Sequence, residues 1–99
     1  MIRFSNVHGD VLVDDRKKDD RRMAYDGLLL DPGGDYLIAT TQASSADVHA
    51  FGKTVRLERF SYLRVRANAS QGGKHNEIWS APQTRYFLAK LWALAGGRL

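Results

Sequence analysis

The stretch Val55–Ala67, VRLERFSYLRVRA, decides the fold that the sequence predicts. Its odd positions are apolar except at Arg59 and Ser61, whereas its even positions are mostly arginine and aromatic residues. Because successive side chains of a strand face opposite sides, and no Gly, Pro, Asn or Asp interrupts the stretch, we predict one long strand with a bend or bulge rather than a hairpin. Its even face would present Arg56, Phe60, Tyr62, Arg64 and Arg66 together.

Basic and aromatic side chains on one strand face suggest nucleic-acid binding, because arginine contacts phosphates and an aromatic ring stacks on an unpaired base. A structural role competes with this interpretation. Phe60 and Tyr62 would pack under a C-terminal helix, and the arginines would block edge-to-edge association of sheets. On the binding interpretation, the phosphate contacts are Arg56, Arg64 and Arg66, the stacking group is Tyr62, and the weaker candidates are Arg59 and Lys74.

Charge is divided unequally between the two halves of the chain. Residues 1–50 carry nine Asp and six Lys or Arg, whereas residues 51–99 carry two Glu and nine Lys or Arg, so the balances are −3 and +7. A basic half attracts a polyanion or an acidic protein surface. We therefore expect a small non-enzymatic protein that binds nucleic acid or a nucleoprotein. The alternative is a protein-binding adaptor or inhibitor of the phage-like, mobile-element type.

Length and composition predict one folded domain spanning residues 1–99. The chain is 43% hydrophobic and 26% charged, which are proportions typical of globular proteins. It has no cysteine, so disulfides, thiolate zinc sites and cysteine nucleophiles are excluded. The first residues lack a secretion signal, and no apolar run approaches the ~20 residues that span a bilayer. We expect a cytoplasmic protein with no membrane contact and no cofactor.

Two hairpins and a charged segment are predicted in the first half. Residues 2–13 alternate around a His8-Gly9 turn, and residues 27–41 flank the turn sequence Asp31–Asp35. The charged run Asp14–Arg22 gains no net support from helical pairing, which predicts a solvated loop or a frayed helix. The alternative is a recognition arm.

Two helices complete the expected α+β fold, in which an antiparallel sheet of five or six strands carries a C-terminal helix on one face. Ser44 and Gly52 predict a short helix at about 46–51. Ser80 and Gln83 predict a helix over 81–95 with a continuous apolar stripe. Its reverse side is a possible homodimer or partner face, comprising Tyr86, Ala89 and Ala93.

Sequence signals for catalysis and metal binding are weak. His8, His49 and His75 lack paired-ligand spacing, so no metal site is expected. Gly73-Lys74 resembles the end of a phosphate-binding loop, but Asn68 stands where that motif needs its first glycine.

Gly73–Trp79 resembles the glycine-histidine strand of the small HicA-type toxins that cleave messenger RNA, and Leu88–Gly97 resembles their closing helix. The resemblance covers about a quarter of the chain and implies a cleavage role for His75. The chain lacks the strand expected between these elements, and its first fifty residues lack the opening helix-strand layout of the family. Ribonuclease activity is the third functional hypothesis, against which His75 is a turn residue beside Gly72-Gly73.

Overall fold

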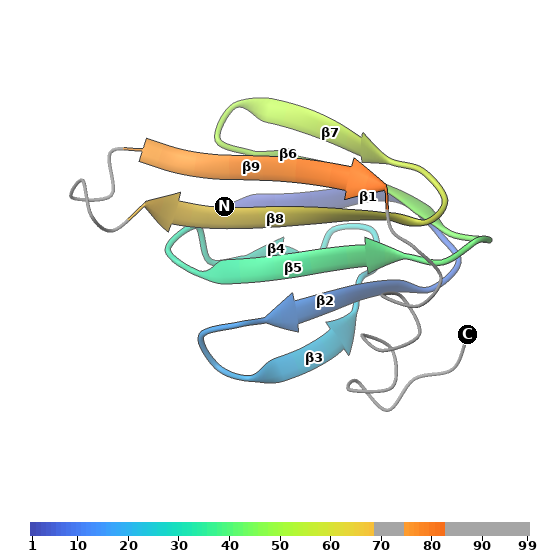
Figure 1. The fold of residues 1–99 in the computed structure, drawn as a ribbon, viewed down its shortest axis with the longest axis horizontal. Coiled ribbons are helices and arrows are strands. Elements are labelled where there is room, and N and C mark those ends of the chain that lie inside the picture. Colours follow the sequence, from blue (N-terminus) through green and yellow to red (C-terminus); the bar gives the residue numbers. More distant parts are fainter. Residues whose placement is uncertain (69–74, 83–99) are drawn as a thin grey trace.

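The computed structural model describes residues 1–68 and 75–82, which form two antiparallel sheets packed face to face (Figure 1). The strand order is β4-β1-β6-β7 in the four-stranded sheet and β3-β2-β5-β8-β9 in the five-stranded sheet. The strands are β1 (Ile2–His8), β2 (Val11–Asp15), β3 (Asp20–Met23), β4 (Leu29–Leu30), β5 (Asp35–Thr40), β6 (Ser45–Ala50), β7 (Lys53–Leu57), β8 (Ser61–Asn68) and β9 (His75–Pro82).

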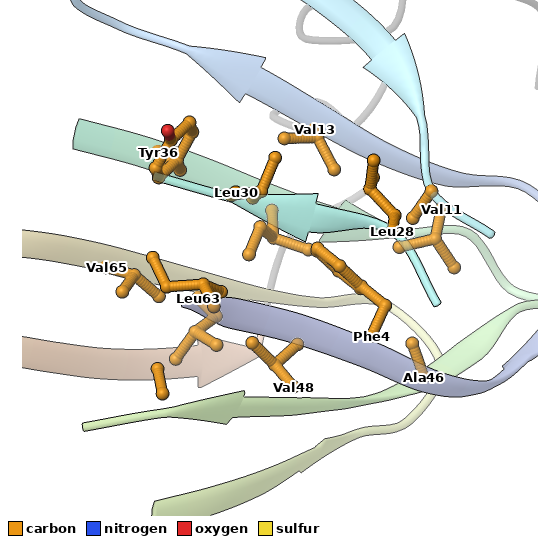
Figure 2. Close-up of a cluster of buried hydrophobic side chains, with 14 of the residues drawn as sticks. Phe4, Val11, Val13, Leu28, Leu30, Tyr36, Ala46, Val48, Leu63 and Val65 are labelled. Carbon is orange, nitrogen blue, oxygen red and sulfur yellow. The ribbon is translucent and has the colours of Figure 1, made fainter. Parts of the chain in front are cut away.

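The interior lies between the two sheets, where buried side chains from both meet (Figure 2). Phe4 and Val48 come from the four-stranded sheet, and Val13, Ile38 and Leu63 come from the five-stranded sheet. All five are at most 1% exposed. In β1 and β6 these side chains alternate with polar neighbours, so the four-stranded sheet buries one face against the five-stranded sheet.

The predicted α+β class is wrong, because the described residues are all-β. The residues assigned to the helix at 46–51 form β6, where Ala46, Val48 and Ala50 are buried and alternate with half-buried polar residues. Ser44 does not begin a helix. Its hydroxyl oxygen accepts a hydrogen bond from the backbone N–H of Thr41 at 2.7 Å and so closes the turn before β6.

The predicted start of the C-terminal helix is also wrong, because Ser80–Pro82 belongs to β9 and pairs with β8. The remainder of that helix, from residue 83, lies outside the described residues. In place of a single sheet of five or six strands, the described chain forms sheets of four and five. None of the described residues forms a helix long and apolar enough to cross a membrane.

Neither predicted hairpin forms, because each turn carries the chain from one sheet to the other. β1 pairs with β4 and β6, whereas β2 pairs with β3 and β5. Gly9, between β1 and β2, has φ +70°, and a Cβ there would lie 2.7 Å from the carbonyl oxygen of Ala43. The Asp31 turn is present, since its carboxylate accepts the Gly33 N–H at 2.9 Å, but it links β4 to β5 across the sandwich.

The charged run is neither a loop nor a helix but a hairpin formed by β2 and β3. Asp15 accepts the backbone N–H groups of Lys17 and Lys18, both at 3.1 Å, and this fixes the turn. Asp14 is fully buried, with Arg16 and Arg21 at 3.3 and 3.4 Å from its carboxylate. Cation pairing at these positions explains how a run of charges enters a sheet.

Val55–Ala67 divides into the end of β7 and nearly all of β8, which belong to different sheets, so the single long strand is also a wrong prediction. Thr40 holds the segment in which the chain passes from β7 in one sheet to β8 in the other. Its buried hydroxyl donates to the carbonyl of Glu58 at 2.6 Å and accepts from the N–H of Ser61 at 2.9 Å. Phe60, at φ 51°, completes the turn through a 3.1 Å bond from its N–H to the carbonyl of Thr41.

Replacing Thr40 by Val is expected to lower the free energy of unfolding by about 1–3 kcal/mol, because the Ser61 amide and the Glu58 carbonyl lose their part-buried hydrogen bonds to the hydroxyl. Urea denaturation measures this cost. Thr40→Ser retains the hydroxyl and is the matched control. Equal destabilisation by the two substitutions would contradict the role of the hydroxyl in the crossing.

Candidate functional site

Three of the predicted site residues share one face of β8. Tyr62, Arg64 and Arg66 stand opposite Ala39, Leu37 and Asp35 of β5, on the side of the five-stranded sheet that faces away from the core. We call the side of each sheet turned away from the other sheet its outer face, and we call these three residues the β8 face. The period-two alternation in the sequence therefore placed them together correctly.

The aromatic side chains at this end of β8 have apolar neighbours. Half-buried Phe60 and Tyr62 pack against buried Leu12 and Ala39 of β2 and β5. The structural alternative, in which these rings pack rather than project freely, is thus partly realised. Tyr62 as a whole is partly exposed.

Arg64 is held by an acidic neighbour. Its Nε and Nη2 atoms donate to the two carboxylate oxygens of Asp35 at 3.2 and 2.8 Å. This two-point geometry fixes the guanidinium and neutralises much of its charge. Arg66 stands directly opposite Asp35 in the sheet register, so two arginines share the neighbourhood of one carboxylate.

Arg56 is separated from the β8 face, because β7 belongs to the other sheet. Its guanidinium donates to Asp47 at 3.3 Å, to Ser45 at 3.0 Å and to Glu58 at 3.5 Å, so its hydrogen-bonding capacity is largely used within the protein. Arg59 lies exposed in the turn before β8 and forms no ion pair with any described residue. Lys74, Tyr86, Ala89 and Ala93 lie outside the described residues.

A second group of polar residues, which the sequence analysis missed, occupies the outer face of the four-stranded sheet. Arg3, His49 and Thr54 stand directly opposite one another on β1, β6 and β7. The hydroxyl of Ser5 lies 2.6 Å from Nε2 of His49, and the hydroxyl of Thr54 lies 3.0 Å from Nδ1. We call Arg3, Ser5, His49 and Thr54 the hydroxyl-imidazole row.

Asp47 lies beside this row and is held by its own partners. The side-chain amide of Asn6 donates to its carboxylate at 2.8 Å and, with Arg56, holds the pKa of Asp47 below its usual value. The folded-state pKa is depressed, so this stabilisation is present at neutral pH and is lost as the pH falls through that pKa. Asn6 has φ 49° at an irregularity in the pairing of β1 with β6. Such irregularities commonly redirect side chains at functional surfaces.

The histidines and acidic groups do not assemble a metal site within the described part of the chain. His75 opens β9 and stands opposite Asn68 of β8, rather than in a turn. Residues 1–50 form strands β1 to β6 and no helix, contrary to the opening helix-strand layout of the toxin family.

Comparisons of the chain with protein-family models, with curated proteins and with solved structures each find no match.

Proposed function

We propose that this protein is a small non-enzymatic binding module whose β8 face, together with Arg59, engages single-stranded nucleic acid. The observation that supports the proposal is the clustering of Tyr62, Arg64 and Arg66 on one outer face, adjacent to exposed Arg59. A partly exposed tyrosine followed by two arginines on the same strand face offers stacking and phosphate contact. The proposal includes a cytoplasmic location, where such a partner is accessible.

The geometry ranks the arginines. Arg59 is exposed at the start of β8, whereas Arg64 is neutralised by Asp35 and Arg56 is held by Asp47 and Glu58 on the other sheet. An arginine already paired within the protein releases fewer counterions from bound nucleic acid, because its charge is compensated before binding. Arg59 is therefore the proposed principal phosphate contact.

Replacing Arg59 by Gln is expected to reduce the slope of log affinity against log salt for single-stranded RNA or DNA by about 0.7 to 0.9. Tyr62→Ala should weaken binding by roughly 1–3 kcal/mol with little change in slope, because stacking releases few counterions. Fluorescence anisotropy at several salt concentrations measures both quantities. Arg56→Gln is the matched control. If Arg56→Gln reduced the salt slope as much as Arg59→Gln does, the assignment of the nucleic-acid site to the β8 face would be contradicted.

A protein-binding adaptor is the second candidate function. It is favoured by exposed apolar side chains in the edge strands β3 and β4 and in the segment between them. Met23, Tyr25 and Leu29 are 40%, 60% and 50% exposed, and all three lie between β3 and β4 or in those edge strands. Exposed Tyr and Met are typical of protein interfaces. Copurification from the native host with and without nuclease separates the candidates, since a partner that survives nuclease and is lost in Tyr25→Ala supports the adaptor.

A further inference from the structure

We propose that the hydroxyl-imidazole row on the outer face of the four-stranded sheet binds a phosphate group, and that protonation of His49 strengthens this binding. The site is independent of the β8 face, because the two outer faces belong to different sheets and point away from each other. Its residues are Arg3, Ser5, His49 and Thr54.

The row brings together the side chains that phosphate recognition requires. Residues directly opposite each other in antiparallel strands have Cβ atoms about 4.5–5.5 Å apart, so one phosphate can contact neighbours in the row. Arg3 supplies a guanidinium fork, which matches phosphate oxygens in two-point contacts. Arg3 is exposed and forms no ion pair with any described residue.

The partners of His49 explain why its protonation matters. Both ring nitrogens contact hydroxyl groups, and a hydroxyl has one proton to donate and lone pairs with which to accept. A neutral imidazole has one nitrogen that accepts, so either Ser5 or Thr54 must direct its proton into the ring. A protonated imidazole donates from both nitrogens, which frees both hydroxyl protons to point at an external oxygen. Protonation thus adds a positive charge and a second outward donor at the same place.

Among the charged groups around His49, Arg3 is the cation that has no ion-pair partner in the described residues. Arg3 and His8 lie on β1, Asp47 on β6 and Arg56 on β7, all on this outer face. Asp47 and Glu58 both pair with Arg56, and Asn6 also donates to Asp47, so Arg3 is the cation that remains for an external anion. The arrangement favours a phosphate monoanion even before His49 is protonated, and more strongly afterwards.

The test is a titration of the protein with dimethyl phosphate at constant ionic strength, followed by NMR, at about pH 5.5 and about pH 8, on either side of the ordinary pKa of histidine. This diester keeps one negative charge over the range, so a change in affinity reports the protein. Wild type should bind at least about fivefold more tightly at the lower pH, as expected for one added unit charge about 4 Å away in water. The shifted resonances should be those of Arg3, Ser5, His49 and Thr54.

Three variants make the test specific. Arg3→Gln should weaken binding at both pH values, whereas His49→Gln should abolish the pH dependence. His8→Gln is the matched control, because His8 lies on the same face outside the row, and it should behave as wild type. Dispersed amide spectra of each variant establish that it is folded. Retained pH dependence in folded His49→Gln, or wild-type shifts that avoid the row, would overturn the proposal.

Two further titrations identify the source of the phosphate. Glycerol phosphate represents a small phosphomonoester, and a single-stranded oligonucleotide represents a nucleic-acid backbone. Tighter binding of the oligonucleotide at His49 assigns the row to a polymer, and tighter binding of the monoester assigns it to a small metabolite. Oligonucleotide shifts confined to Tyr62 and its neighbours would leave the β8 proposal standing and refute a backbone role for the row.

Discussion

Phe4→Ala is expected to lower the free energy of unfolding by about 3–5 kcal/mol, the cost typical of removing a large aromatic side chain from a packed core. Phe4 is 0% exposed and lies between the sheets, in contact with the cluster that includes Val48 and Leu63 (Figure 2). Its loss removes apolar burial and leaves a cavity that two hydrogen-bonded sheets close poorly. Urea or guanidinium denaturation followed by circular dichroism measures the change.

Leu29→Ala is the matched control for this prediction. Leu29 lies in β4 beside β1, opposite Arg3 on the outer face, and is 50% exposed. Surface substitutions of this kind usually change stability by less than about 0.5 kcal/mol. Similar costs at Phe4 and Leu29 would contradict the assignment of the two faces of the four-stranded sheet.

The second large effect is expected in the charged hairpin, where Arg21→Met should destabilise the fold by about 2–3 kcal/mol. Loss of one partner from a fully buried ion pair costs about 3–5 kcal/mol, and the remaining Arg16 and the 23% exposure of Arg21 reduce that figure. The cost arises because the buried Asp14 carboxylate loses a cation. Chemical denaturation at neutral pH measures it.

Arg22→Met provides the control, since Arg22 is the exposed neighbour of Arg21 in β3 and should change stability by less than about 0.5 kcal/mol. The interaction between Asp14 and Arg21 is checked in the double variant Asp14→Asn/Arg21→Met. Its loss of unfolding free energy should be smaller than the sum of the losses in the two single variants. Strict additivity would show that Asp14 and Arg21 do not interact as the structure places them.

The sequence predicted strands more successfully than it predicted their partners. Alternation over Val55–Ala67 identified strand residues and the common face of Tyr62, Arg64 and Arg66. The turn at Asp31 was also located. Turn chemistry, however, specifies a local bend and does not specify which sheet the next strand joins. Both predicted hairpins failed for this reason, and the single strand failed because Phe60 adopts a positive φ without a glycine.

The misassigned helix and the missed site have related causes. At 45–50, alternating burial within a sandwich overrode the capping preference of Ser44, which was used in a turn instead. The hydroxyl-imidazole row depends on pairing between Ser5 and His49, which are 44 positions apart. No local pattern encodes that register. The one local indication was that Asp47 and His49 alternate with alanine and valine, a pattern typical of a strand with one exposed face.

The most direct test of the proposed function is the affinity of the wild-type protein for single-stranded RNA and DNA at physiological salt. The β8 face and Arg59 predict saturable binding with a Kd below about 100 μM, the weak limit typical of non-specific nucleic-acid binders. Fluorescence anisotropy with a labelled oligonucleotide measures this affinity. Saturable binding that Tyr62→Ala weakens and Arg56→Gln preserves is the predicted result, and the absence of binding up to about 100 μM would contradict the nucleic-acid function.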